Sequence, residues 1–142
     1  MKDIRWKQRY SNFTNMVGVL KRNFLDVPLE NLDEIHLIGL SKSFELSHEL
    51  MWKLFKDYLE YKEVKVEIKA PVHILRMIAS VGILENIADG DILMKAHQCR
   101  NELVHVYDAK GFLKHLEEVK AVFLPEMLKV DAFFGGLADA HE

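Results

Sequence analysis

The sequence predicts an all-α protein, an antiparallel up-and-down bundle of four to five helices. Apolar residues recur at spacings of three and four along every long segment, which places them on one stripe of a 3.6-residue helix. Only one stretch alternates like a strand, and a lone strand would have no partner to pair with. With 142 residues, 49% of them apolar, the chain has enough material for one domain with its own core. We expect that domain to cover residues 1–134 and a loose tail to follow over residues 135–142.

Two long helices are expected first. An apolar stripe runs from Trp6 to Phe24 and stops near the turn-like segment 26–28 (Asp, Val, Pro). A second stripe is almost unbroken from Asp33 to Lys62, which predicts a helix of roughly 45 Å that spans the whole domain. After it, valine and isoleucine alternate with charged residues over residues 62–69, and we interpret this stretch as an extended connector.

A third and a fourth helix follow the connector. Pro71 suits the first turn of a short helix that Gly82 would end. Asp89 offers capping chemistry for the next helix, whose apolar residues follow a 4, 3, 4, 3 rhythm typical of the core face of a bundle. These residues are Ile92, Ala96, Cys99, Leu103 and Val106.

The last predicted helix begins after Asp108, which can cap it. Pro125 should kink or break this helix because proline lacks a backbone donor and clashes with the preceding turn. Gly135 and Gly136 should end it. Its apolar stripe consists of Phe112, Leu116, Val119, Phe123, Met127 and Val130.

Charge and cysteine content exclude several functional classes. Nineteen Lys and Arg against 22 Asp and Glu give a net charge of -3, so no global basic field draws the chain to nucleic acid or to an anionic membrane. We expect neither DNA nor a membrane as a partner. The single cysteine, Cys99, excludes an internal disulfide framework and fits a reducing compartment. No apolar run reaches a membrane span and no signal peptide is evident, so we expect a cytoplasmic protein.

Polar and aromatic residues cluster at the end of the fourth helix, in residues 100–108. On a wheel of 100° per residue, Asn101 lies roughly 180° and His105 roughly 140° from the apolar stripe, so both point away from their own bundle. That back face also carries Leu93, Met94 and, more laterally, Val104. Apolar residues on an outward face predict a second burial, most simply a homodimer through this helix. By spacing alone, the same pattern is also typical of a solvated outer face.

The motifs of most enzyme classes are absent, including the glycine-rich phosphate loop, the HExxH helix, the CxxC pair and the GxSxG elbow. A spacing of four, as in some helical metal sites, relates His97, Asn101 and His105. No third strong ligand lies nearby, so we predict no metal site. One basic cluster could follow an RNA backbone or be a solvated face. It consists of Lys2, Arg5, Lys7, Arg9, Lys21 and Arg22.

A family resemblance adds to this interpretation. Arg100, four residues, His105, one residue and Tyr107 match the Arg-x4-His-x-Tyr signature of the HEPN superfamily, including the polar Asn101 directly after the arginine. Residues 44–59 of the long second helix resemble the corresponding segment of the branch described as nucleotidyltransferase substrate-binding proteins. The resemblance extends over most of the chain, and it is closest to the HepT-like toxin of a pair with a minimal nucleotidyltransferase.

The resemblance implies a homodimeric, metal-independent endoribonuclease with no cofactor, often the toxin half of a toxin and antitoxin pair. His105 would deprotonate the ribose 2′-hydroxyl or protonate the leaving oxygen, and Arg100 would stabilise the charge of the transition state. Asn101 would orient this pair or the substrate. Tyr107 resembles the tyrosine that the cognate nucleotidyltransferase modifies with AMP to silence the toxin. Candidates for a supporting role on the second helix are Glu45 and Glu49.

Three functions remain open at this stage. The first is the ribonuclease toxin, and the second is a non-catalytic subunit that binds nucleotide or substrate for a two-component nucleotidyltransferase. These two share a fold and a partner, and they differ in whether Arg100 and His105 cleave RNA or only bind phosphate. The third is a scaffolding bundle without a site.

Overall fold

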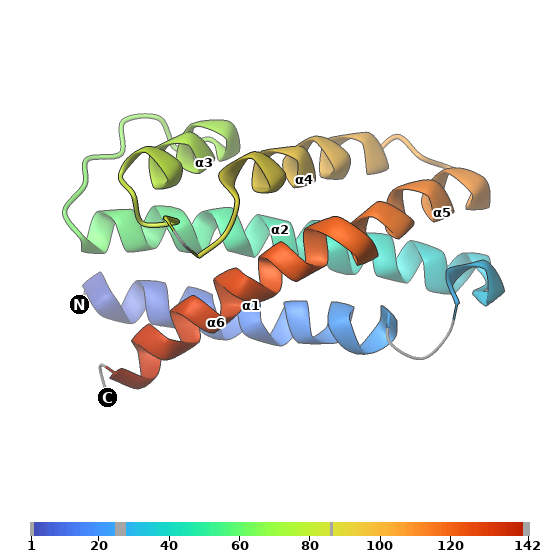
Figure 1. Cartoon of the computed structure of the whole chain (residues 1–142), viewed down its shortest axis with the longest axis horizontal. Helices are drawn as coiled ribbons and strands as arrows, with labels where there is room; N and C mark the ends of the chain where they lie inside the picture. Colours follow the sequence, from blue (N-terminus) through green and yellow to red (C-terminus); the bar gives the residue numbers. More distant parts are fainter. Residues whose placement is uncertain (1, 25–27, 86, 141–142) are drawn as a thin grey trace.

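Two long antiparallel helices, α1 (Lys2–Phe24) and α2 (Glu34–Tyr61), form the base on which the other helices pack (Figure 1). The computed structural model describes residues 2–24, 28–85 and 87–140, and all regular structure in these ranges is helical. α3 (Pro71–Ser80) and α4 (Gly90–Leu103) follow one another along α2, and the rod formed by the last helices crosses the bundle obliquely. The predicted all-α bundle is confirmed.

The core lies between α1, α2 and the last helix. The predicted stripe of α1 is buried, because Trp6, Phe13, Val17, Leu20 and Phe24 are each at most 1% exposed. The Trp6 ring meets the Tyr58 ring edge-on at 5.5 Å between centroids and the Phe134 ring at 5.9 Å. Aromatic burial of this kind contributes roughly 1.5–3 kcal/mol per side chain. The predicted stop at Asp26 and Val27 lies outside the described residues.

The ends of α2 follow the sequence signals. The Asp33 carboxylate accepts a hydrogen bond from the backbone N–H of His36 at 2.9 Å and so caps the helix at the residue where the predicted stripe begins. The helix ends at Tyr61, one residue before the expected boundary. Residues 62–69 contain no strand, and the predicted connector is confirmed. α3 begins at Pro71, and Gly82 adopts a φ of 76° just after the helix ends, as its role as a stop signal requires.

The predicted last helix consists of three pieces: α5 (Ala109–Glu118), a π-helical turn η2 (Val119–Phe123) and α6 (Leu124–Ala140). Pro125 explains the interruption, because its ring would clash with the carbonyl four residues earlier in a regular α-helix. The chain widens instead, and the N–H of Leu124 bonds to the carbonyl of Val119, five residues back. The predicted break at Pro125 therefore takes the form of a π-turn.

The prediction that Gly135 and Gly136 end the last helix is wrong, because α6 continues through both residues to Ala140. Gly135 allows close packing instead of a stop. A Cβ atom at this position would lie 2.7 Å from the Tyr10 hydroxyl oxygen, so the missing side chain allows α6 to approach α1. The neighbouring Phe134 is fully buried and anchors this end of the helix.

Candidate functional site

The helix that carries the motif, α4, is fixed at its start by two carboxylates. The Asp89 side chain accepts hydrogen bonds from the backbone N–H groups of Asp91 and Ile92, which caps the helix. Glu126 of α6 in turn accepts from the Asp89 N–H at 3.0 Å. The inner face of α4 is buried, so the helix is held at its N-terminus and along its length.

The helix ends at Leu103, before the second half of the motif. The N–H groups of His105 and Val106 bond to carbonyls three residues back, so the chain leaves the helix in a tight turn. The helical wheel therefore does not apply to His105 or Tyr107, and the predicted continuation of the stripe to Val106 is wrong. Both motif side chains are nevertheless exposed, and Tyr107 is 86% exposed. The turn leads directly into Asp108, which caps α5 as predicted.

The predicted apolar back face of α4 is wrong in part. Leu93 is fully buried in the core of its own chain, and Met94 packs partly buried against that core. Of the three residues assigned to this face, only Val104 is exposed, at 39%. The wheel was centred on Cys99 and Leu103, whereas the buried face also includes Leu93 and His97. The apolar argument for a dimer interface therefore loses most of its support.

A chain of hydrogen bonds, buried at its histidine end and exposed at its arginine end, connects Arg100 to α2. His48 of α2 and His97 of α4 are 1% and 8% exposed, and His48 Nε2 lies 2.9 Å from His97 Nδ1. The Asn101 amide nitrogen, Nδ2, lies 3.3 Å from His97 Nε2. The Arg100 guanidinium donates a hydrogen bond to the amide oxygen, Asn101 Oδ1, at 3.2 Å. The last histidine nitrogen, His48 Nδ1, is buried without a partner among the described residues. An unpaired buried polar group of this kind costs about 1–3 kcal/mol.

Burial and a nearby cation keep both histidines neutral. Burial, with the charges of His97 and Arg100, lowers the pKa of His48 to about 3. Burial and the Arg100 charge likewise lower the pKa of His97. Glu49 opposes both shifts, since its negative charge favours the protonated rings. The site thus contains one permanent cation, Arg100, next to two uncharged rings.

Of the two predicted supporting acids, Glu49 lies in the electrostatic environment of the site. Burial raises its pKa, but hydrogen bonds from Lys53 and Trp52 and the charges of Lys53 and Arg100 outweigh burial, so the net shift is downward. The Trp52 indole donates to Glu49 at 3.2 Å and Lys53 pairs with it at 2.9 Å. Glu45, one turn earlier on α2, is half-buried.

Two of the three residues spaced by four, His97, Asn101 and His105, are in contact, but the three do not form a metal site. His97 and Asn101 are hydrogen-bonded, as their spacing of four on one helix allows, whereas His105 lies beyond the helix end. Within the described residues, no three His, Cys, Asp or Glu side chains are grouped to hold a metal ion. The sequence analysis missed the pairing of His48 with His97. The available signal was a histidine within the apolar stripe of each helix.

Cys99 is not a reactive group. The side chain is 4% exposed, and burial together with Glu118 and Glu102 raises its pKa to about 12. The thiol therefore stays protonated at neutral pH and acts as a packing residue.

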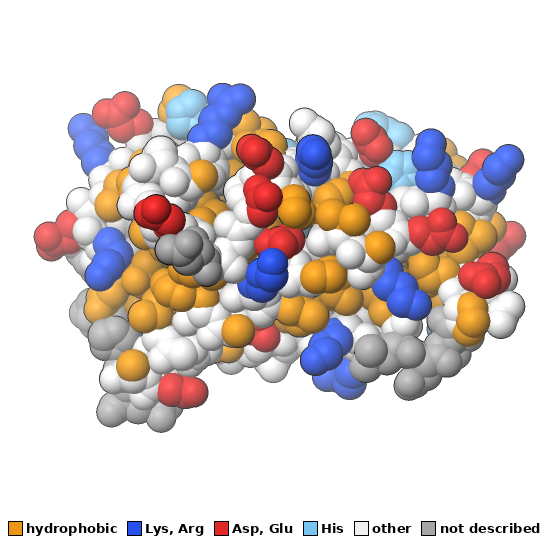
Figure 2. All heavy atoms as spheres, in the orientation of Figure 1, with side chains coloured by type: hydrophobic (Ala, Val, Ile, Leu, Met, Phe, Trp, Pro, Cys, Tyr) orange, Lys and Arg blue, Asp and Glu red, His pale blue; other side chains and the backbone are white. Residues whose placement is uncertain are grey.

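The basic cluster near the N-terminus is partly neutralised. Arg9 pairs with the buried Asp57 of α2 at 3.0 Å, and Arg5 pairs with Glu60 at 3.5 Å. On the face shown in Figure 2, basic and acidic side chains are interspersed. These observations favour a solvated, ion-paired surface over a continuous path for RNA. No helix in the described part of the chain is long and apolar enough to cross a membrane.

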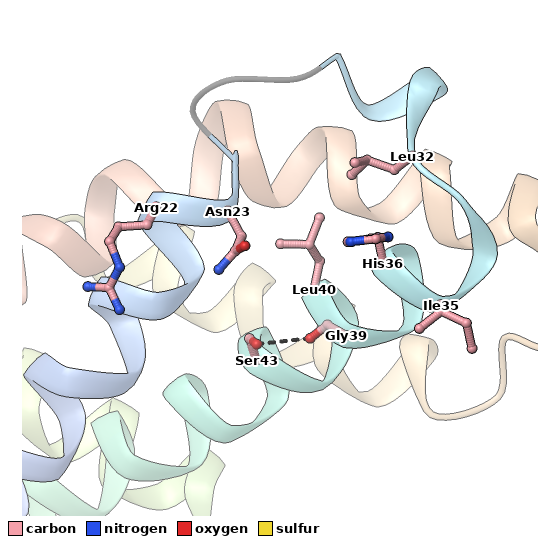
Figure 3. A pocket seen from close by; sticks show the side chains of 8 residues that line it. All are labelled: Arg22, Asn23, Leu32, Ile35, His36, Gly39, Leu40 and Ser43. Atoms are coloured by element: carbon pink, nitrogen blue, oxygen red, sulfur yellow. Dashed lines mark hydrogen bonds between the residues drawn. The ribbon is translucent and has the colours of Figure 1, made fainter.

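A separate cavity of about 430 Å³ lies where the end of α1 meets the first turns of α2 (Figure 3). Arg22 and Asn23 of α1 and His36 of α2 contribute its polar groups, and Leu40 contributes an apolar side chain. Gly39 also borders the cavity, and a Cβ atom there would meet nothing within 4 Å. This cavity shares no residue with the motif.

The comparison with known families decides the family of this chain. The profile of a family described as "Nucleotidyltransferase substrate binding protein like" matches residues 8–134. The chain belongs to this family. The family's description associates its members with a nucleotidyltransferase. The predicted resemblance to the nucleotidyltransferase substrate-binding branch of the HEPN superfamily is confirmed. No curated protein shows significant similarity to the chain.

Proposed function

We propose that this member of the nucleotidyltransferase substrate-binding family is a metal-independent endoribonuclease, the toxin of a pair with a minimal nucleotidyltransferase. One observation carries the proposal: a guanidinium held by a neighbouring amide, Arg100 with Asn101, lies five residues before an exposed imidazole, His105. A fixed cation and a side chain that can act as general base or acid are the two groups that cleavage of RNA without a metal uses. Such an activity on cellular RNA is expected in the cytoplasm.

The proposed reaction uses the RNA 2′-hydroxyl as its nucleophile. A base removes the hydroxyl proton, the 2′-oxygen attacks the adjacent phosphorus, and the bond to the 5′-oxygen breaks as an acid protonates that oxygen. The products are a 2′,3′-cyclic phosphate and a free 5′-hydroxyl. Arg100 stabilises the extra negative charge on the phosphorus oxygens, and His105 supplies the base or the acid. In a homodimer, the two copies of His105 would serve both roles.

Regulation in this proposal acts through Tyr107. Its side chain is 86% exposed and lies two residues from His105, so a nucleotidyltransferase can reach its hydroxyl. Transfer of AMP from ATP forms a phosphodiester bond to the tyrosine oxygen and releases pyrophosphate. The added anion would then repel RNA phosphate from Arg100 and occupy the same space.

The test is cleavage of a labelled structured RNA by purified protein in EDTA. We expect wild-type protein to release 2′,3′-cyclic phosphate ends, and we expect Arg100→Ala and His105→Ala to lose at least roughly 100-fold in rate, a typical loss for such groups. Arg76→Ala and His73→Ala are matched controls, since both remove an exposed residue of the same type from α3. If wild-type dimer leaves RNA intact, or if the motif variants cut as fast as the controls, the proposal fails.

The family description favours a second candidate, a non-catalytic subunit that binds nucleotide or substrate for its nucleotidyltransferase. Here Arg100 binds phosphate without any bond being broken. This candidate predicts saturable binding of ATP or RNA that Arg100→Ala weakens and Arg76→Ala does not. Intact RNA after binding would favour this candidate over the ribonuclease.

A further inference from the structure

The motif extends into the protein interior through two residues outside the Arg-x4-His-x-Tyr pattern. We propose that His97 is a positioning residue and that the chain His48–His97–Asn101–Arg100 is a one-way hydrogen-bond relay that fixes the direction of the Arg100 guanidinium. The structural part of this proposal stands alone, and its consequence for RNA cleavage rests on the proposed function. His48 anchors the relay on α2, where its ring packs 6.3 Å from the Phe44 ring.

Arginine sets the direction of the relay, because a guanidinium only donates hydrogen bonds. Arg100 therefore requires the oxygen of the Asn101 amide to face it, and the amide nitrogen must then face His97. That nitrogen donates to His97 Nε2, so the proton of the neutral His97 ring is on Nδ1. The same reasoning continues across the 2.9 Å contact, where His97 Nδ1 donates to His48 Nε2. Each ring thus has one defined tautomer, with its proton on Nδ1.

A second proton on either ring breaks the relay. Protonating His97 at Nε2 would place its N–H against the Asn101 amide hydrogens, and protonating His48 at Nε2 would place it against the His97 Nδ1 proton. Burial and the Arg100 charge oppose both events, and Glu49 from α2 is the charged group that favours them. The relay therefore works only with neutral rings, and this is the state that its surroundings stabilise.

Stability alone does not account for the two histidines. His48 Nδ1 is left without a partner, an unfavourable arrangement that two apolar side chains would avoid. The histidine pair instead orients the Asn101 amide. The two buried rings stack at 5.1 Å between centroids, and His97 contacts the amide from the side of the core. Arg100 is then restrained relative to the phosphate it is proposed to bind, before any RNA arrives.

The tautomers can be measured without any activity assay. Long-range proton–nitrogen correlation spectra of protein with ¹⁵N-labelled histidine should show the proton on Nδ1 in both His48 and His97 at pH 7. Arg100→Ala releases the Asn101 amide, so a second His97 tautomer with its proton on Nε2 should appear. Arg76→Ala should leave both spectra unchanged. A proton on His97 Nε2 in wild-type protein, or no response to Arg100→Ala, would overturn the relay.

The second experiment separates positioning from folding through RNA cleavage. The double variant His48→Leu with His97→Leu should remain folded by circular dichroism, yet kcat should fall roughly 100-fold while KM changes less than two-fold, as expected from misplacing a group that acts in the transition state. His97→Gln, which keeps one acceptor and one donor, should recover part of the rate. Equal kcat in the double variant and wild type would refute the positioning role. If wild-type protein cleaves no RNA, the ribonuclease proposal fails while the tautomer spectra still decide the relay.

Discussion

Arg100 and Asn101 differ from His105 and Tyr107 in how their own chain holds them, although only six residues lie between the two ends of this motif. The first two lie on α4, a helix capped at its start and packed along its length, and the relay connects them to buried rings. The last two lie in the turn after Leu103, exposed to solvent. One half of the motif is thus fixed by its own chain, and the other is presented outward.

This difference indicates how the site is divided between the protein and its partners. The fixed half suits a group that must stabilise charge at one place, since preorganised charge does not have to reorganise during a reaction. The exposed half suits groups that must meet another molecule, whether RNA, a second copy of the chain or the enzyme that would modify Tyr107. A perturbation confined to one half should therefore leave the other unchanged.

The largest expected effect is a loss of folding stability at low pH, and it should arise only in the fixed half of the motif. Because the folded protein holds the pKa values of His48 and His97 below the ordinary value of about 6.5, the unfolded chain binds more protons once the pH falls below that value. The free energy of unfolding should be constant from about pH 7 to 8 and fall between about pH 6 and 5, by at most about 1.4 kcal/mol per pH unit for each ring. Urea unfolding at a series of pH values measures this slope.

Two variants show whether the slope belongs to the relay. In the double variant His48→Leu with His97→Leu, the curve should be nearly flat from pH 6.5 to 5. His105→Ala removes an exposed histidine from the other half and should keep the wild-type slope. A double variant that loses stability as steeply as wild type would assign the acid response to other groups.

A smaller effect is expected from a change confined to the turn. A Cβ atom on Gly111 would lie 2.7 Å from Val106 Cγ1 and 2.9 Å from the Asp108 carboxylate oxygen that caps α5. Gly111→Ala should therefore displace the turn that holds His105 and Tyr107 and cost about 1–3 kcal/mol of unfolding free energy. Thermal or urea unfolding measures the loss.

The matched control is Gly136→Ala, a helical glycine whose added Cβ would meet nothing within 4 Å. It should be neutral or stabilise the protein by up to about 1 kcal/mol, because alanine favours the helix. The histidine tautomers should be the same in both variants. A shift of the His97 tautomer in Gly111→Ala would show that the two halves are coupled.

The sequence predicted the parts of this molecule that depend on local patterns. Apolar spacing located both ends of α2 to within one residue and the end of α1, which begins four residues before the predicted stripe. Asp89 and Asp108 marked helix starts because a capping carboxylate acts on the next few backbone groups. Arg100 and Asn101 were identified by their place in a short motif. Each of these signals lies within a few residues of the structure that it specifies.

What the sequence could not predict depends on contacts between distant segments. His48 and His97 are 49 residues apart, and nothing local shows that one ring faces the other. The end of α4 at Leu103 was missed because neither glycine nor proline follows it, and the chain leaves the helix to reach the cap at Asp108. Gly135 resembles a stop signal until the Tyr10 hydroxyl is seen beside it.

The smallest effect on folding, and the sharpest test of the exposed half, is expected from Tyr107→Phe. A side chain that is 86% exposed contributes little packing, so the unfolding free energy should change by less than about 0.5 kcal/mol. The substitution removes the hydroxyl that would accept AMP. With radiolabelled ATP and the cognate nucleotidyltransferase, label should transfer to wild-type protein and to Tyr61→Phe but not to Tyr107→Phe. Because neither change touches the relay, RNA cleavage by unmodified Tyr107→Phe should persist in the presence of the transferase and ATP, while wild-type cleavage stops. If Tyr107→Phe still takes up label, Tyr107 is not the residue that the transferase modifies, and the exposed half of the motif has another role.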